Sequence, residues 1–158
     1  MTDQPYTPKR RRRILAVASG GGHWIELLRL RPAFEGHDVA YVTVRDSYRS
    51  YLDGERLHVV NDATRWDKFG LMRCACRILW IILRERPHII ISTGAAHGYF
   101  AFVFAKLLRR RTVWVDSISN AEKISDTAER IGRWADLVLT QWPDLARPDG
   151  PRYEGAIL

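Results

Sequence analysis

The sequence lacks the features of a disulfide-stapled, secreted or metal-binding protein. Its two cysteines are Cys74 and Cys76, whose spacing within a helical pattern makes them point to different sides of the helix. This arrangement suits neither a disulfide nor a metal site, and it indicates a reducing compartment. The apolar run that follows the basic N-terminal segment is only about five residues long, which is too short for a secretory signal. We therefore expect a cytoplasmic protein without a bound metal.

Acidic residues are also in deficit, with 18 Asp and Glu against 25 Lys and Arg and a net charge of +7. The basic excess is concentrated in an unbroken run over residues 9–13 and a shorter run over 109–111. Both runs suggest an anionic partner. No helix-turn-helix, zinc-finger or RNP motif accompanies them, and the aromatic residues are not interleaved with the basic ones, so we expect no nucleic acid. An anionic membrane surface fits better, and a merely soluble basic tail is the alternative.

The length of 158 residues and the hydrophobic content of 46% suit one domain with a real core. Residues 1–12 are polar, basic and proline-containing, so we expect a flexible basic arm there. Residues 13–158 are then the folded domain.

The most informative stretch covers residues 13–30. Residues 14–18 form a nearly uninterrupted apolar run, typical of a parallel strand buried on both faces, and the run stops at Ser19 and three glycines, Gly20, Gly21 and Gly22. The apolar residues beyond are spaced as on a helix that begins near His23. A strand, a glycine loop and a helix N-terminus direct backbone amides at one point and form a cradle for an anion such as phosphate. The alternative is that the glycines only turn the chain.

His23 itself is a candidate general base. A histidine in the first turn of such a helix projects toward the bound ligand, and imidazole titrates near neutral pH. The alternatives are a helix cap or a solvated side chain.

The remaining chain repeats the alternation of strand and helix. We expect strands at residues 38–44, 58–60, 88–91, 111–115 and 137–140, and helices at 66–86, from about 98, and at 125–134. Residues 87–105 carry no formal charge and resemble a transmembrane span by hydropathy, but their strand, small-residue loop and helix pattern argues against one. The repetition predicts an α/β fold: a Rossmann-like, doubly wound, mostly parallel sheet with helices on both faces and strand order 3-2-1-4-5-6.

This strand order makes the first and fourth strands neighbours at the topological switch point, where ligands bind beyond the carboxyl ends. The loop after the fourth strand contains Thr93, Gly94 and His97, and the loop after the fifth strand contains Asp116, Ser117 and Asn120. We therefore expect one crevice with both histidine-bearing loops facing it and the third loop as its next wall.

The helix expected at 66–86 is unusually apolar for a surface helix. Arginines interrupt or flank it, so it does not suit a bilayer span. It suits a position in the membrane interface, and burial within the domain or under a partner is the alternative.

Four motifs together resemble the N-terminal half of a GT-B glycosyltransferase. They are Ser19-Gly20-Gly21-Gly22-His23, Ser92-Thr93-Gly94-Ala95-Ala96-His97-Gly98, Val113-Trp114-Val115-Asp116-Ser117 and Tyr153-Glu154-Gly155. The resemblance covers nearly all of residues 14–158. It is greatest to the membrane-side, acceptor-binding subunit of the split UDP-N-acetylglucosamine transferase of dolichol-linked oligosaccharide synthesis, and to its bacterial exopolysaccharide counterparts. It is more distant to the single-chain transferase that forms lipid II.

The resemblance implies transfer of N-acetylglucosamine, a related hexose or a uronic acid from a UDP-sugar to a polyprenyl-diphosphate-linked acceptor. It implies that this chain holds the acceptor, needs a donor-binding subunit in a heterodimer, uses no cofactor, and lies on the cytoplasmic face of the membrane as a peripheral protein. His23 falls on the histidine that closes the family's first glycine loop, which makes it the catalytic candidate. The residues expected at the acceptor and its diphosphate are Ser19, Gly20, Gly21, Gly22, Thr93, Gly94, His97, Asp116, Ser117 and Asn120.

The sequence departs from these families at two places. The transmembrane anchor of the eukaryotic subunit is absent from these residues, and Ala95-Ala96-His97 stands where the lipid II enzyme has a more glycine-rich turn.

Two other functions remain open. An oxidoreductase needs Gly-x-Gly-x-x-Gly, but Ile25 occupies the third glycine position, and the second strand ends in Val44-Arg45 where a ribose-binding carboxylate is expected. Arg45 leaves an NADP-binding domain as an alternative. A noncatalytic scaffold that recruits a catalytic partner to the membrane is the other.

Overall fold

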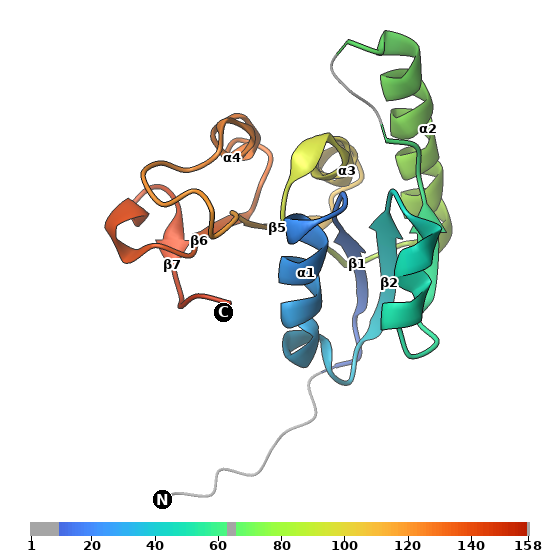
Figure 1. Ribbon diagram of the computed structural model, residues 1–158, viewed down its shortest axis with the longest axis horizontal. Coiled ribbons are helices and arrows are strands. Elements are labelled where there is room, and N and C mark those ends of the chain that lie inside the picture. The colour runs from blue at the N-terminus through green and yellow to red at the C-terminus, as the bar shows by residue number, and fades with distance from the viewer. Residues whose placement is uncertain (1–9, 63–65, 158) are drawn as a thin grey trace, which may run out of the picture.

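The computed structural model describes residues 10–62 and 66–157, which form one parallel sheet flanked by helices (Figure 1). The sheet has seven strands in the order β3-β2-β1-β4-β5-β6-β7. Their bounds are β1 (Arg13–Val17), β2 (Asp38–Thr43), β3 (Arg56–Val59), β4 (Ile89–Ser92), β5 (Arg111–Val115), β6 (Leu137–Thr140) and β7 (Arg152–Tyr153). The predicted order is confirmed, with β7 added at the edge. Of the expected basic arm, residues 1–9 lie outside the described residues, and residues 10–12 are exposed.

β1 is a central strand because it pairs in parallel with β2 on one side and β4 on the other. Its side chains alternate between the two faces of the sheet, as strand geometry requires. Leu15 and Val17 belong to one core cluster, whereas Ile14 and Ala16 belong to the other. Both faces are therefore buried, which explains the continuous apolar sequence of this strand.

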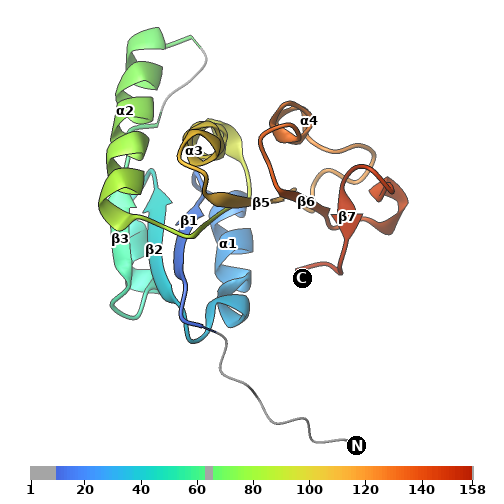
Figure 2. The same cartoon turned by 180° about the vertical axis from the view of Figure 1, so that it is seen from behind.

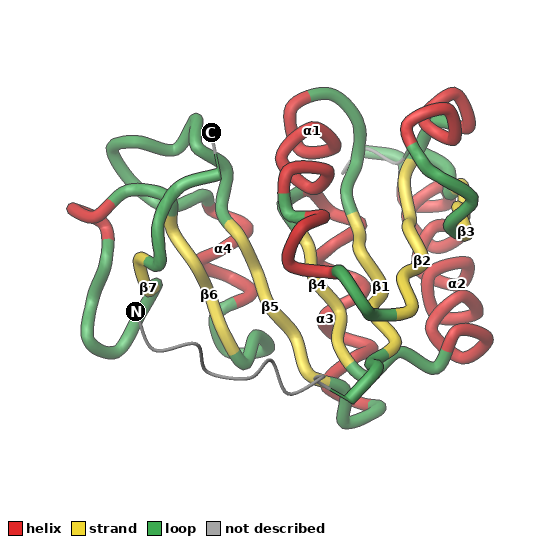
Figure 3. Tube along the Cα trace, turned by 90° about the horizontal axis from the view of Figure 1, so that it is seen from below, coloured by secondary structure: helices red, strands yellow, loops and turns green. Residues whose placement is uncertain are grey.

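Helices cover both faces, as Figures 2 and 3 show. Their bounds are α1 (Gly22–Arg29), α2 (Lys68–Glu85), α3 (Ala95–Leu107) and α4 (Asp126–Ile131). α1 packs Trp24 and Leu27 into the cluster that contains Ile14, and the other three helices pack into the opposite cluster. None of the described helices is long and apolar enough to cross a membrane. Residues 87–105, with their hydropathy typical of a span, mainly form β4 and α3.

Two predicted boundaries were wrong. α3 begins at Ala95 and not near residue 98, so Gly98 lies inside this helix. A β-carbon on Gly98 would lie 2.9 Å from Cζ3 of Trp114 and would also collide with Ser92, so the glycine allows α3 to approach the sheet closely. α4 is shorter than expected and ends at Ile131.

The edge strand β7 was not predicted. It has two residues, whose pairing partners are Leu139 and Thr140 of β6. A strand this short carries no periodicity that a sequence pattern can reveal.

The cysteines point to different sides of α2, as expected. Cys74 is buried and Cys76 is exposed. Burial raises the pKa of the Cys74 thiol to about 11, so this cysteine is a packing residue in the core.

The close contact at Gly98 predicts an asymmetric response to alanine. Gly98→Ala places its new methyl group against Ser92 and the Trp114 ring, and overpacking of this kind lowers the free energy of unfolding by about 1–3 kcal/mol. Gly132→Ala is the matched control, since its β-carbon meets only ordinary contacts, the nearest at 3.5 Å. Urea unfolding of both variants measures the difference. Equal stability of the two would contradict the proposed tight contact between α3 and the sheet.

Candidate functional site

The two glycine-containing loops meet at the carboxyl ends of the neighbouring strands β1 and β4. The Thr93 hydroxyl donates to the backbone oxygen of His23 at 2.7 Å and so ties the start of α1 to the second loop. The His23 ring lies against Gly94, where a β-carbon would be 2.5–2.9 Å from three ring atoms. Only a residue without a side chain allows the histidine to occupy this place.

A pocket of about 360 Å³ opens beside these loops. Its wall includes Ser19, Gly20 and Gly21 from the first loop and Ala95, Ala96 and His97 from the second, together with Val44, Arg45 and Asp62. The expectation that both loops border one pocket therefore agrees with the structure.

The Arg45 side chain in the pocket wall and the start of α1, which follows the pocket-lining Gly21, favour an anion. Gly22 and His23 occupy the first two positions of α1, where backbone amides have no acceptor within the helix. The Arg45 guanidinium makes no ion pair or hydrogen bond with any residue that the structure describes, and its Nε lies 3.7 Å from the point where a β-carbon on Gly20 would be. The exposed carboxylate of Asp62 is the one negative group in the described wall.

The amide of Gly21 is not free for a ligand, because it donates to the Tyr48 hydroxyl at 2.9 Å. The Tyr48 ring stacks on Trp24, with ring centroids 4.9 Å apart and planes 6° from parallel. Tyr48 thereby fixes the glycine loop on α1. Sequence analysis missed this residue, which lies in the short 3-10 helix Asp46–Tyr51 after β2.

His97 differs from His23 in its surroundings. It is 2% exposed, and its Nε2 lies 3.2 Å from the backbone oxygen of Asn61. Burial lowers its pKa, which favours a neutral ring. His97 therefore forms part of the pocket wall, while His23 keeps a side chain that is 35% exposed.

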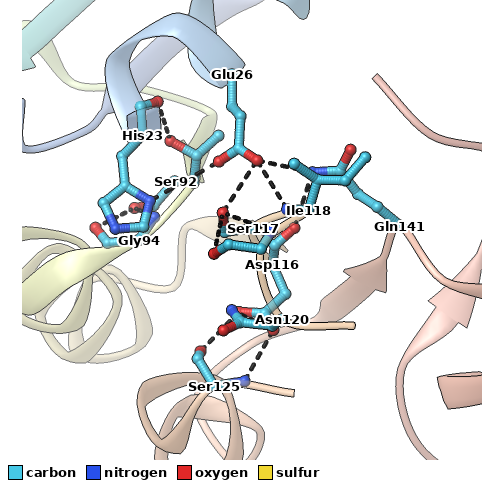
Figure 4. A network of polar contacts seen from close by, with 12 residues as sticks. His23, Glu26, Ser92, Gly94, Asp116, Ser117, Ile118, Asn120, Ser125 and Gln141 are labelled. Atoms are coloured by element: carbon cyan, nitrogen blue, oxygen red, sulfur yellow. Dashed lines mark hydrogen bonds and ion pairs between the residues drawn. The ribbon is translucent and has the colours of Figure 1, made fainter. Parts of the chain in front are cut away.

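Glu26 is a buried carboxylate that sequence analysis did not identify. It is 5% exposed, and its Oε1 accepts from the Ser117 hydroxyl at 3.1 Å, the Ile118 amide at 2.8 Å and the Gln141 side-chain amide at 3.3 Å (Figure 4). Its Oε2 lies 3.8 Å from Nδ1 of His23.

The pKa of Glu26 reflects two opposing effects. Burial alone raises it, but the adjacent His23 ring and the hydrogen bonds from Ile118 and Ser117 together lower it below its usual value. The carboxylate beside His23 is therefore ionised at neutral pH. The spacing of three residues on α1, which places both side chains on one helix face, was the available sequence signal.

Asp116 has a different place from the one expected. Its carboxylate accepts from Trp114 Nε1, Asn120 Nδ2 and both the amide and the hydroxyl of Ser125. Asp116 is 3% exposed, so these bonds order the loop between β5 and α4.

The third loop is therefore not a wall of the described pocket. Asp116, Ser117 and Asn120 are absent from its lining, and their polar groups bond within the protein. Their expected contact with the acceptor has no support from this geometry. Ser117 instead donates a hydrogen bond to Glu26.

No group of three or more His, Cys, Asp or Glu side chains in the described chain is placed to hold a metal ion.

Comparison of sequences supports the resemblance drawn from the glycine loops. The chain is similar to the Eremothecium gossypii protein named UDP-N-acetylglucosamine transferase subunit ALG14, with 25% identity over 180 residues that cover 93% of this chain and 80% of that protein. No protein-family model matches the chain.

Comparison of structures confirms the fold. MurG from Acinetobacter baumannii superposes with a TM-score of 0.74 at 13% identity, over 90% of this chain and 45% of MurG. A glycosyltransferase from Rickettsia africae gives a TM-score of 0.64 at 14% identity, over 84% and 37%. UDP-N-acetylglucosamine 2-epimerase from Rickettsia bellii gives 0.64 at 12% identity, over 84% and 39%. The chain thus spans less than half of each of these proteins and has the fold of one GT-B half-domain.

The buried carboxylate predicts a pH-dependent contribution to stability. The folded-state pKa of Glu26 lies below the ordinary value of 4.5. The contribution of the ionised carboxylate to the free energy of unfolding is therefore fully present above pH 4.5, and it is lost as the pH falls through the lower, folded-state pKa. We expect Glu26→Gln to lower the free energy of unfolding by about 1 kcal/mol at neutral pH, because charge-assisted hydrogen bonds are lost. The difference from the wild type should shrink at acidic pH. Urea unfolding over a pH series measures it, with exposed Glu35→Gln as the control, and a difference independent of pH would contradict an ionised Glu26.

Proposed function

We propose that this chain is the acceptor-side subunit of a two-component glycosyltransferase. The observation that carries the proposal is the similarity to a protein named as a transferase subunit, which extends over 93% of the chain. The proposed reaction transfers N-acetylglucosamine, a related hexose or a uronic acid from a UDP-sugar to a polyprenyl-diphosphate-linked acceptor. Polysaccharide or lipid-linked oligosaccharide biosynthesis is the proposed setting.

The pocket beside the glycine loops is the proposed site for the acceptor diphosphate. The helix N-terminus at Gly22 and His23 offers amides, and Arg45 offers an unpaired guanidinium next to Gly20. Arg45 is an addition to the residues expected from the sequence, of which Ser19, Gly20, Gly21 and His97 also line the pocket. The expected residues Gly22, Thr93 and Gly94 lie in the same two loops but are not in the pocket lining.

His23 is the proposed general base. Its Nε2 makes no hydrogen bond within residues 10–62 and 66–157, whereas its Nδ1 faces Glu26. In the proposed step, Nε2 takes the proton of the acceptor hydroxyl as that oxygen bonds to the anomeric carbon of the donor sugar. The bond from that carbon to UDP breaks, and UDP leaves with the bonding electron pair.

The donor-binding half is assigned to a second polypeptide. The similar Eremothecium gossypii protein is named as a subunit of a transferase, which supports this assignment.

Peripheral attachment to the cytoplasmic face of the membrane is the proposed location. α2 carries an exposed apolar stripe, which we define as Phe69, Met72, Trp80 and Leu83, with side chains 44–75% exposed. Their spacing of three, eight and three residues places them on one face, opposite the buried residues Cys74 and Ile78. This helix therefore has two apolar faces, one toward the core and one toward solvent.

Arginines border the exposed stripe. Arg77 and Arg84 lie over the Trp80 ring, with guanidinium carbons 4.5 and 5.3 Å from its centroid. Aromatic and aliphatic groups bordered by cations suit the boundary between lipid headgroups and acyl chains. The N-terminal end of α2 also projects beyond the carboxyl ends of the strands, the edge where the pocket lies (Figure 1).

The proposed function predicts activity only in the assembled pair. The purified chain should transfer little sugar from UDP-N-acetylglucosamine or UDP-glucuronate to a polyprenyl-diphosphate-linked sugar, and transfer should appear when the donor-binding subunit is added. Within the pair, His23→Ala should lower turnover roughly 10²- to 10⁴-fold, since a general base is lost. The matched control is His37→Ala, because His37 lies before β2, away from the pocket lining.

Two outcomes would reject parts of this proposal. Full turnover by the rigorously purified single chain would contradict the need for a partner. Normal turnover of the His23→Ala pair would favour the noncatalytic scaffold.

Membrane attachment gives a separate prediction. The chain should sediment with vesicles that contain phosphatidylglycerol, and salt should weaken this binding because each basic residue near the surface contributes about 1 kcal/mol. Removal of residues 1–12 should reduce the salt-sensitive part, and Phe69→Ser with Trp80→Ser should reduce the part that resists salt. Ile25→Ser is the control, as Ile25 is 43% exposed on the opposite face of the sheet. Unchanged binding by both variants would show that neither the arm nor the stripe is the anchor.

A further inference from the structure

We infer that Glu26 is the positioning residue for His23, holding the ring in the tautomer that carries its proton on Nδ1 and leaves Nε2 free to accept one. The predicted effect of Glu26 on turnover rests on the proposed function. The predicted tautomer of His23 rests only on the contacts described below.

The two atoms that face each other have no other partner. Glu26 Oε2 and His23 Nδ1 are both buried and without a hydrogen bond to any described residue, and they are 3.8 Å apart. A buried polar atom left unpaired is destabilising, so two such atoms side by side favour a bond between them. The carboxylate has no proton to give, and therefore the proton of the pair belongs on Nδ1. A small ring rotation closes the distance, as occurs when catalytic hydrogen bonds tighten on ligand binding.

The other oxygen of Glu26 is held firmly. Three donors from outside α1 converge on Oε1: the Ser117 hydroxyl, the Ile118 amide and the Gln141 side chain (Figure 4). Because all three engage the same oxygen, Oε2 is left to point at His23. The carboxylate is thus fixed in orientation as well as in charge.

The orientation of Gln141 is itself determined by its neighbours. Its Oε1 accepts from the Ile157 amide at 3.0 Å, and its Nε2 also donates to the backbone oxygen of Asp116 at 3.0 Å. Exchanging the amide oxygen and nitrogen would place an acceptor against two acceptors, so the amide nitrogen must face Glu26.

The ring of His23 is restrained on its other side. Its backbone oxygen is bonded to Thr93, and its ring packs on Gly94. These contacts limit the ring to a position in which Nδ1 faces Glu26, so Nε2 is the nitrogen available to an acceptor hydroxyl.

The orientation of these donors makes Glu26→Gln a sharp test. In this variant the three donors still require an oxygen at the position of Oε1, so the amide NH₂ must occupy the position of Oε2. That NH₂ would donate to Nδ1 of His23 and move the ring proton to Nε2, which blocks proton acceptance there. A wrong tautomer of this kind lowers turnover by roughly 10²- to 10⁴-fold in enzymes that use a carboxylate–histidine pair.

The experiment is long-range ¹H–¹⁵N NMR on the chain with labelled histidine, at an alkaline pH where histidine rings are neutral. His23→Ala identifies the His23 signal, and Glu35→Gln is the control for loss of an exposed carboxylate. We expect the Nδ1–H tautomer in the wild type and in Glu35→Gln, and the Nε2–H tautomer in Glu26→Gln. Turnover of the assembled pair should fall in kcat with little change in KM, and Glu26→Asp, which restores the charge, should recover part of it.

The outcomes separate this inference from the proposed function. An Nε2–H tautomer in the wild type overturns the inference without any variant, so a poorly folding Glu26→Gln does not remove the test. An unchanged tautomer in a folded Glu26→Gln overturns it as well. A changed tautomer with unchanged kcat supports the positioning role of Glu26 and instead rejects His23 as the base.

Discussion

The contact between the His23 ring and the backbone of Gly94 is the constraint on which the candidate site depends. It brings the loop after β1 within van der Waals distance of the loop after β4, and the Thr93–His23 hydrogen bond holds them together. Parallel pairing of β1 and β4 places both loops at the same edge of the sheet. The pocket, the amides at the start of α1 and the half-buried His23 ring depend on this one approach, since a side chain at residue 94 would separate the loops.

A second set of contacts connects α1, which carries His23, to the C-terminal part of the chain. Glu26 on α1 reaches the loop after β5 through Ser117 and Ile118, and the end of β6 through Gln141. Asp116 orders that loop by accepting four hydrogen bonds from its own neighbourhood. Asp116 was expected to bind a ligand, but its carboxylate is buried and bonded within the protein. It orders the loop whose Ser117 and Ile118 hold the carboxylate of Glu26.

α2 has two apolar faces, and only one of them packs into the core. One face completes the core through Cys74, Ile78 and Ile81, and the other leaves Phe69, Met72 and Trp80 in solvent. A monomeric domain does not need the second face for folding, so its apolar character points to an external surface. The N-terminal end of α2 projects beyond the edge of the sheet at which the pocket lies (Figure 1).

Sequence alone determined the elements whose signals are local. The apolar run of β1, the glycine loop and the helical spacing after His23 lie within one short window, and the alternation of such windows predicts the strand order. Tertiary structure decided which side chains share a site. Glu26 lies 92 residues from Ile118 and 115 from Gln141, so no local pattern relates them. The same holds for β7, whose two residues form a strand because β6 offers its edge. Hydrophobic periodicity encodes the burial of a segment, but the donors that satisfy a buried carboxylate come from whichever segments the fold brings beside it.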